Sequence, residues 1–299
     1  MGLSDLDRFA AEVGDEGPVT VVGGRTAWEV GGPVDPAARE VRAPCGVVAF
    51  EPADLTVRVG AGTPVAEVDA ALAAAGQAVA LPDGPGATVG GVLAVGRSGV
   101  RRLGWGPVRD ALLEARYVSA EGRLVKAGGP TVKNVSGFDL CRLLVGSLGT
   151  LGLIGEVVLR TRPLPAASRW LAGPADPFAL LHALHRPSSL LWDGTTTWAL
   201  LEGDPADVDE QAAVCERAGM ADADGPPPLP GHRWSLPPGE LRGLTGRFVA
   251  EVGVGVVHAD GPPPPRDLDP VTVDLNERVR SRFDPTRRLN PGRDPLSVS

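Results

Sequence analysis

Glycines in three segments of the first half of the chain are the residues best suited to bind an anion through the main chain. The segments are residues 21–28 (VVGGRTAW), 81–99 (LPDGPGATVGGVLAVGRSG) and 131–156, whose apolar part reads LLVGSLGTLGLI. Glycine destabilises regular helices and strands, so such segments indicate sharp turns or a surface against which a flat group lies. Successive N–H groups in glycine-rich turns bind phosphates without a lysine. One such segment is typical of an ordinary turn, but three together predict a trough for a large anionic cofactor.

Residues 57–67 (VRVGAGTPVAE) support a competing interpretation, in which a strand, a Gly-x-Gly turn and a helix begin a Rossmann nucleotide site. Val65 stands at the position of the third glycine, and Arg58 is charged in what would be a buried parallel strand. Asp83 lies in a Pro-Gly loop, so the acidic ribose ligand of that motif is also missing. A Rossmann NAD site is therefore disfavoured.

Composition and charge exclude several classes of protein. The 299 residues carry a formal net charge of -8 with a sequence pI near 5.1, which leaves no basic face for nucleic acid. The chain contains no apolar span of about 18 residues, and its start resembles an acidic amphipathic helix rather than a signal peptide. Cys45, Cys141 and Cys215 are far apart, so we expect reduced thiols in a cytoplasmic protein.

The elements that would position the glycine segments belong to a first region, residues 1–163, in which strands and helices alternate. We expect strands at 18–24, 55–59 and 151–160, a helix at 64–75 capped by Thr63, and a hairpin at 111–128. Two prolines, Pro163 and Pro165, mark the end of this region.

The second region, residues 164–299, reads strand, helix, strand, strand, helix, strand, which is the ferredoxin-like order. The expected strands are 168–172, 190–193, 196–202 and 248–258, and the helices are 176–185 and 204–219. A last helix is expected to begin at Asp274, with Glu277 completing a capping box and with Leu275, Val279 and Phe283 on one apolar face. The terminal FDPTRRLNPGR is too short to fold alone, so we expect it to pack back on another domain.

The order of these motifs resembles a known family of flavoproteins. The motifs that carry the resemblance are residues 57–77, 81–99, 101–129 and 131–157 and the terminal FDPTRRLNPG. They are similar to the vanillyl-alcohol-oxidase-type (PCMH-type) FAD-binding family, which includes the murein-precursor reductase. Within it they are most similar to the FAD-binding subunits of glycolate oxidase, also called glycolate dehydrogenase. Leu148 in GSLGTLG, where many relatives have an acidic residue, is typical of those subunits.

The resemblance implies an α+β fold in which a two-subdomain PCMH-type FAD-binding domain, residues 1–163, precedes a small ferredoxin-like cap domain, residues 164–299. It places the first glycine segment on the pyrophosphate and the second beside the isoalloxazine and ribityl groups. The third would bind the adenine end, and Asn290 and Gly292 in a returning tail would lie near the flavin domain. The cofactor-binding residues so implied are Gly23, Gly24, Arg25, Thr26, Pro82, Gly86, Ala87, Thr88, Val89, Gly90, Gly91, Gly96, Ser98, Gly99, Arg102, Gly146, Ser147, Gly149, Gly152 and Ile154.

The chain departs from the family pattern at three points. The first glycine segment reads GGRTAW, where the family usually has a third small residue, and we expect this sequence to lack a strand that normally precedes the first helix. Many relatives attach flavin through a histidine in the first glycine segment, whereas the first histidine here is His182. We therefore expect FAD that is bound without a covalent bond.

No catalytic residue can be assigned from the sequence, although oxidation of a 2-hydroxy acid needs a cation for the carboxylate and a base for the hydroxyl proton. His182 and His185 have helical spacing but no third ligand nearby, so a solvated helix face is preferred to a metal site. The other histidines, His232 and His258, are isolated and are interpreted as ordinary. The arginines Arg101, Arg102 and Arg109 are equally consistent with carboxylate binding and with a place beside the flavin phosphates or on the surface. Lys133 and Asp139 are consistent with a functional role and equally with an ion pair that locks their loop.

The expected function is that of an FAD-dependent oxidoreductase subunit acting on a 2-hydroxy acid, or of an accessory flavin subunit. By the resemblance, its partners would be a larger homologous flavin subunit and an iron–sulfur subunit, with contact to a membrane only through them. Three scattered cysteines are too few to bind an iron–sulfur cluster. Two alternatives stay open: a self-sufficient flavin oxidase or dehydrogenase of another alcohol or hydroxy acid, and a non-catalytic assembly subunit.

Overall fold

The computed structural model describes residues 3–82, 84–129, 139–263 and 267–297. The chain forms two compact units, one built from Met1–Ser98, Val108–Pro163 and Asp267–Val298 and the other from Gly99–Pro107 and Leu164–Arg266. The break after Pro163 coincides with the expected boundary. The units differ from the expected division in two stretches, because residues 99–107 belong to the second unit and the end of the chain belongs to the first.

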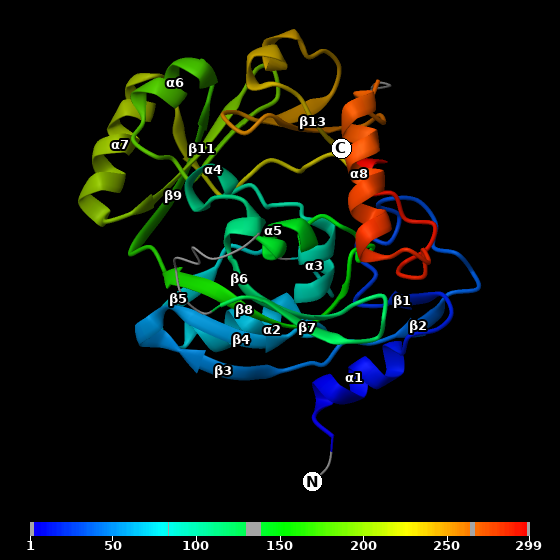
Figure 1. The fold of residues 1–299 in the computed structure, drawn as a ribbon. Coiled ribbons are helices and arrows are strands. Elements are labelled where there is room, and N and C mark those ends of the chain that lie inside the picture. Colours follow the sequence, from blue (N-terminus) through cyan, green and yellow to red (C-terminus); the bar gives the residue numbers. More distant parts are fainter. Residues whose placement is uncertain (1–2, 83, 130–138, 264–266, 298–299) are drawn as a thin grey trace. The chain divides into compact units, whose positions relative to one another are not determined.

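The first unit is built on an antiparallel sheet in the order β3-β4-β8-β6-β7 (Figure 1). The strands are β3 (Val47–Glu51), β4 (Thr56–Gly60), β6 (Leu112–Val118), β7 (Leu124–Gly128) and β8 (Leu153–Pro163), with β5 (Gln77–Val79) paired to the end of β8. Helices α2 (Val65–Ala73), α3 (Val89–Val95) and α5 (Leu140–Leu144) accompany the sheet, and Val65, Leu72 and Leu93 lie in its core. The expected hairpin is confirmed as β6 and β7, and the expected closing strand as β8.

The cap predicted for α2 is wrong. Pro64 stands at the capping position, and Thr63 turns its hydroxyl the other way, donating to Gly60 O at 2.6 Å and accepting from Gly46 N at 2.8 Å. Thr63 is completely buried, so these bonds tie the end of β4 to the preceding loop.

A small parallel sheet at the other side of the first unit joins the two ends of the chain. Strands β1 (Val19–Val21) and β2 (Arg39–Val41) pair in parallel, and Leu289 forms a parallel bridge to Val19. Helix α1 (Asp5–Val13) starts at Ser4, which forms a capping box with Asp7. The expected return of the tail is therefore confirmed, and it adds a third extended segment to this sheet.

Arg288 fastens the tail by donating only to main-chain carbonyl oxygens. Its guanidinium reaches Val13 O at 2.8 Å, Glu16 O at 2.9 Å, Gly17 O at 2.9 Å, Gly14 O at 3.1 Å and Ala120 O at 3.3 Å. The side chain is 5% exposed, and this burial lowers the pKa of Arg288. Two of the acceptors, Val13 and Gly14, end helix α1, where the helix dipole favours a cation.

Helix α8 (Pro270–Phe283) begins earlier than predicted. Asp269 is its cap and accepts from Val271 N at 3.2 Å, so the start at Asp274 with a capping box is wrong. Val279 and Phe283 pack against the core of the first unit, but Leu275 is 57% exposed and does not belong to that buried stripe.

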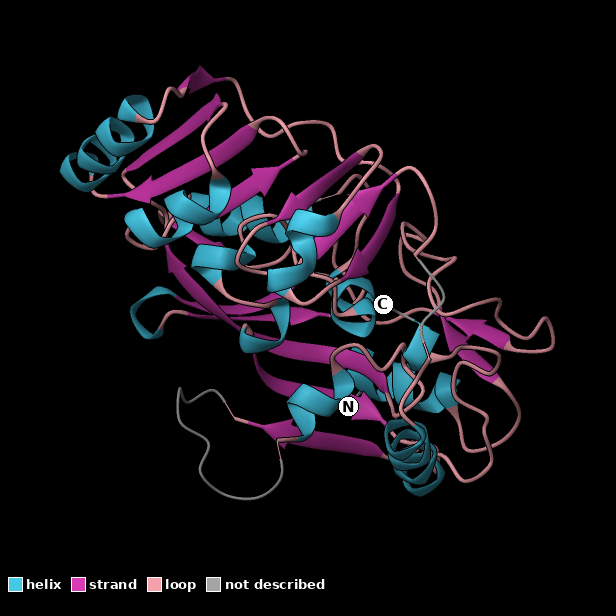
Figure 2. Ribbon diagram, turned by 90° about the horizontal axis from the view of Figure 1, so that it is seen from above, coloured by secondary structure: helices cyan, strands magenta, loops and turns pink. Residues whose placement is uncertain are grey.

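The second unit contains a seven-stranded antiparallel sheet in the order β12-β9-β11-β10-β14-β15-β13, whose strands run side by side in Figure 2. The strands are β9 (Ala167–Gly173), β10 (Ser189–Trp192), β11 (Thr197–Gly203), β12 (Ala221–Ala223), β13 (His232–Ser235), β14 (Phe248–Glu251) and β15 (Val256–Ala259). Its helices are α4 (Arg102–Trp105), α6 (Pro177–Ala183) and α7 (Pro205–Arg217). Asp176 and Asp204 cap α6 and α7, each followed by proline, as their positions in the sequence predict.

The ferredoxin-like order is found, but with a different fourth strand. The order β12-β9-β11-β10 is the ferredoxin arrangement, and β12 at Ala221–Ala223 takes the place expected for residues 248–258. Those residues form a hairpin, β14 and β15, because Gly253 and Gly255 have φ of +83° and +84° and turn the chain back. The hairpin and β13 extend the sheet beyond β10.

Candidate functional site

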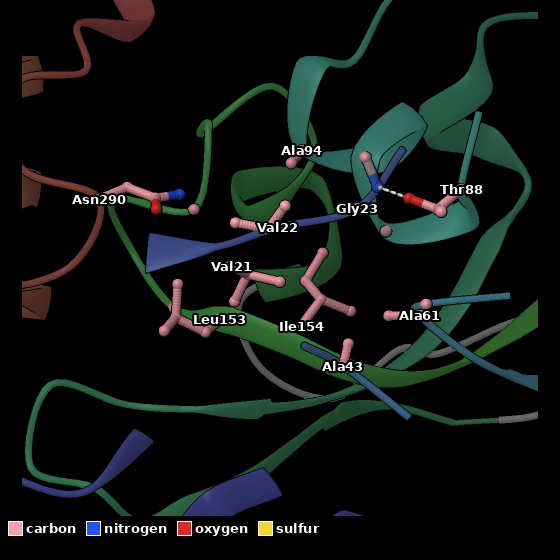
Figure 3. A pocket seen from close by; sticks show the side chains of 15 residues that line it. Val21, Val22, Gly23, Ala43, Ala61, Thr88, Ala94, Leu153, Ile154 and Asn290 are labelled. Carbon is pink, nitrogen blue, oxygen red and sulfur yellow. Dashed lines mark hydrogen bonds between the residues drawn. The ribbon is translucent and has the colours of Figure 1, made fainter. Parts of the chain in front are cut away.

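A pocket lies where distant parts of the first unit meet (Figure 3). The chain brings the end of β1, the turn after β4, helix α3 and the start of β8 to this point. The lining residues are Val21, Val22, Gly23, Ala43, Ala61, Gly62, Thr88, Gly90, Gly91, Ala94, Gly149, Gly152, Leu153, Ile154 and Asn290. Most of these side chains are small or apolar, so the walls suit a flat aromatic group rather than a charged one.

Helix α3 places the polar groups of this pocket. Thr88 is its capping residue, and the hydroxyl accepts from Gly91 N at 3.3 Å, drawn as the dashed line in Figure 3. The other end of α3 is bonded to the third glycine segment, because Gly146 N donates to Leu93 O at 3.0 Å and Leu148 N to Ala94 O at 2.8 Å. These bonds fix the position of residues 146–149 relative to α3.

The glycines around the pocket allow two loops to interlock. A Cβ on Gly23 would overlap the hydroxyl of Thr88, and a Cβ on Gly24 would overlap Gly86 O. A Cβ on Gly90 would lie 2.9 Å from Ala61 Cβ. We expected the missing side chains to leave room for the cofactor, but at these positions the space is filled by the protein itself. The glycines therefore shape the trough by close packing of its walls.

Four successive main-chain N–H groups in the first glycine segment identify the anion-binding part of the site. Among the hydrogen bonds of the described residues, none uses the N–H of Gly23, Gly24, Arg25 or Thr26. Arg25 has φ of +56°, a conformation that non-glycine residues rarely adopt. Consecutive N–H groups around a left-handed residue form an anion-binding nest. The donor set therefore fits the diphosphate of a dinucleotide.

A second pocket, lined by the residues of this nest, adjoins the first one, since Gly23, Thr88, Gly91, Ala94 and Asn290 line both. Trp28 lines this second pocket near two guanidinium groups, with Arg25 at 4.8 Å and Arg293 at 4.9 Å from the ring centre. Arg25 also pairs with Glu40 at 2.6 Å.

Asn290 brings the tail to the site in a strained conformation. Its φ is +43°, its side-chain amide donates to Leu148 O at 2.5 Å, and its side-chain oxygen accepts from Thr20. The tail residue thereby joins β1 to the third glycine segment. The sequence pointed to this residue only through the resemblance.

About half of the expected cofactor-binding residues meet at these two pockets. They are Gly23, Gly24, Arg25, Thr26, Thr88, Gly90, Gly91, Gly149, Gly152 and Ile154. Pro82, Gly86, Ala87, Val89, Gly96 and Ser98 line neither of them, and Gly146 and Ser147 line a different groove beside α8. Gly99 and Arg102 belong to the second unit.

The structure explains why several of the expected residues do not line these two pockets. Val89 is fully buried in the core, and the Ser98 hydroxyl accepts from Val108 N at 2.9 Å. Gly96 ends α3 with φ of +72° and lies against Gly146. The apolar lining residues Val21, Val22, Ala43 and Leu153 were missed, because nothing in an apolar strand distinguishes a pocket wall from the core.

The histidines and arginines that the sequence singled out lie at different places in the structure. His182 and His185 are exposed on and after α6, and no cluster of three metal-ligating side chains occurs in the described part of the chain. Arg101 pairs with Glu202 at 3.0 Å, and Arg109 lies 4.0 Å from Asp110. Lys133 lies outside the described residues.

Comparisons with known proteins agree with this geometry. Residues 4–128 match the model of the FAD binding domain family. The chain is 36% identical over 166 residues to glycolate oxidase subunit GlcE of Escherichia coli, covering 54% of this chain and 47% of that protein. It is 42% identical over 107 residues to D-lactate dehydrogenase of Archaeoglobus fulgidus, covering 35% of this chain and 24% of that protein. The chain thus spans less than half the length of these relatives.

Among solved structures, alkyldihydroxyacetonephosphate synthase is similar with a TM-score of 0.68 at 14% identity, covering 96% of this chain and 73% of that one. This likeness shows a shared fold. Within the described residues, no helix is long and apolar enough to cross a membrane. The matched family model, the shared fold and the glycine-lined trough agree: residues 4–128 of this chain are similar to the FAD binding domain family, which supports FAD as the cofactor.

Proposed function

We propose that this chain is the FAD-binding subunit of an oxidoreductase that acts on a small 2-hydroxy acid, similar to glycolate oxidase. The observation that carries the proposal is that Gly23, Gly24, Arg25 and Thr26 line one pocket while none of the hydrogen bonds among the described residues uses their N–H groups. The relatives named for glycolate and D-lactate oxidation support the substrate class.

Different residues of the chain bind different parts of the cofactor. The N–H groups of the first glycine segment, with the hydroxyls of Thr26 and Thr88, hold the diphosphate. The apolar pocket bounded by Ala43, Leu153 and Ile154 holds an aromatic ring, which the resemblance assigns to adenine. Bound FAD supplies a two-electron acceptor for oxidation of the carbon that carries the hydroxyl group. All four histidines lie in the second unit, so we propose that FAD is held without a covalent bond.

The electrons then pass to an iron–sulfur partner, beside a larger flavin subunit. This part of the proposal rests on the resemblance to glycolate oxidase subunits, two of which are among the relatives. Cys141 and Cys215 are buried and Cys45 is exposed, and the three are free thiols. The chain therefore offers no cluster of its own.

A substitution that fills the pocket tests the proposal. Ala94→Leu keeps a strong helix former on α3 and adds bulk to a side chain that lines both pockets. We expect FAD affinity, measured by fluorescence quenching and calorimetry, to fall at least tenfold, about 1.4 kcal/mol. Ala70→Leu on the exposed side of α2 is the matched control and should bind FAD like the native chain. Equal affinity in all three chains, or no FAD binding by the native chain, would refute the proposal.

A further inference from the structure

Helix α8, drawn in orange in Figure 1, carries an apolar stripe of which only one end is buried. Val279 and Phe283, four residues apart, pack against the core of the first unit. The same spacing continues backwards to Leu275 and Val271, but these side chains are 57% and 71% exposed. Leu268, just before the helix, is exposed as well. The first two turns of α8 therefore present apolar side chains that the described residues leave in contact with water.

A groove in the first unit runs beside this stripe. One side is lined by α8, including Leu275, and the other by α5 and residues 145–151. Leu143 on α5 lines the groove and is itself exposed. Exposed apolar side chains that gather at a concave surface are typical of a protein–protein contact. The groove and the exposed half of the stripe together form one candidate docking surface.

The charges on the exposed side of α8 change sign along the helix. Val271, Asp274, Leu275 and Arg278 stand at positions i, i+3, i+4 and i+7, so they share one face. Asp274 and Arg278 are 68% and 75% exposed, and they lie 3.7 Å apart within the helix. Such an exposed pair contributes little to the stability of the chain itself. An acidic residue followed one turn later by a basic one is matched by the same helix running in the opposite direction.

A second copy of this chain supplies such a helix. In an antiparallel pair of α8 helices, Asp274 of each copy faces Arg278 of the other, and two-fold symmetry forms this contact twice. The two helix macrodipoles then also point in opposite directions, which is favourable. Apolar side chains on the same face, Val271 and Leu275, meet their counterparts or the groove of the other copy. Charge order and apolar pattern thus select the same occupant.

We propose that two copies of this chain associate through α8, each helix lying antiparallel to the other over the groove beside α5. Burial of Val271, Leu275 and Leu143 supplies most of the free energy of association, because exposed ion pairs contribute little. The ion pairs between Asp274 and Arg278 set the direction of the two helices. Among the described residues, those that line this groove do not line the two cofactor pockets. Dimerisation and FAD binding are therefore tested independently.

Sedimentation equilibrium of the full chain, with and without bound FAD, measures the association. The native chain should be a dimer at micromolar concentration. Leu275→Ala keeps a strong helix former and should weaken association by about tenfold or more, because it removes apolar surface from the contact. Val273→Ala is the matched control, since Val273 is an exposed apolar residue of α8 that lies off the stripe, and it should keep the native dissociation constant.

Charge reversal tests whether the partner is a second copy. Asp274→Arg and Arg278→Asp should each weaken self-association by about tenfold, because like charges then meet twice across the two-fold axis. An equal mixture of these two variants should associate as tightly as the native chain, since every contact between them again joins opposite charges. Circular dichroism confirms that each variant is folded. A native chain that is monomeric throughout the micromolar range, or a mixture no tighter than its separate components, would overturn the inference. Failure to bind FAD would instead refute the proposed function.

Discussion

The attachment of the tail by Arg288 predicts that one buried side chain controls both stability and the cofactor site. Arg288→Met keeps an unbranched stem of similar length but removes the hydrogen bonds that Arg288 donates to five carbonyl oxygens. The contacts to Val13 O and Ala120 O are fully buried, whereas water can reach the other three acceptors.

The magnitude follows from those two acceptors. A buried carbonyl left without a donor costs about 1–3 kcal/mol, and this applies to Ala120 O, because Val13 O still accepts from Arg39 at 3.2 Å. Removing a buried charge recovers part of this cost, so we expect the free energy of unfolding to fall by about 1–2 kcal/mol. Asn290 lies two residues further along and lines the pocket, so FAD affinity should fall as well.

Urea unfolding followed by circular dichroism, with FAD titration by fluorescence, measures both effects. Arg282→Met, an exposed arginine on α8, is the control and should change the free energy of unfolding by less than about 0.5 kcal/mol. If Arg288→Met matched this control in stability, the tail would be held by other contacts and the reasoning would be refuted.

Three further substitutions or treatments have defined outcomes. Burial alone would raise the pKa of Glu114, but hydrogen bonds and charges from Lys126 and Arg58 outweigh burial and lower that pKa. The Glu114 carboxylate therefore stabilises the fold above pH 4.5, and this stabilisation is lost in more acidic solution. Glu114→Gln should therefore be less stable than the native chain at pH 7 by about 3 kcal/mol, with a smaller loss of stability on acidification below pH 4.5; parallel curves would contradict this. Burial raises the pKa of Cys141 to about 11, so about one in a thousand of its thiols is ionised at pH 8, and iodoacetamide should label exposed Cys45 first by mass spectrometry; rapid labelling of Cys141 in the folded chain would count against its burial. Gly24→Ala should lower FAD affinity and thermal stability together, because its Cβ overlaps Gly86 O, and an unchanged melting temperature would show that the loops do not interlock.

Local sequence patterns were sufficient where neighbouring residues decide the structure. Asp176-Pro177 and Asp204-Pro205 start helices as predicted, since capping and the fixed φ of proline act within one turn. The β6–β7 hairpin likewise follows from two β-rich runs joined by a short turn. Thr63 and Asp274 show where local patterns fail, because each residue type can cap a helix but neither does so here. The Thr63 hydroxyl bonds to Gly46 and Gly60 instead, and the last helix already begins after Asp269.

The sequence alone determined that glycine-rich loops of the first half belong together, because their composition is unfavourable in any regular element and suits bound phosphate. Only the tertiary structure decided which of these glycines face the pocket and which face each other, since a missing Cβ looks the same in both cases. It also decided the position of Asn290 at the site and the pairing of Glu251 with His258. Both depend on contacts between segments that are distant along the chain or separated by a turn, and hydrogen-bond partners of that kind leave no periodic signal in a sequence.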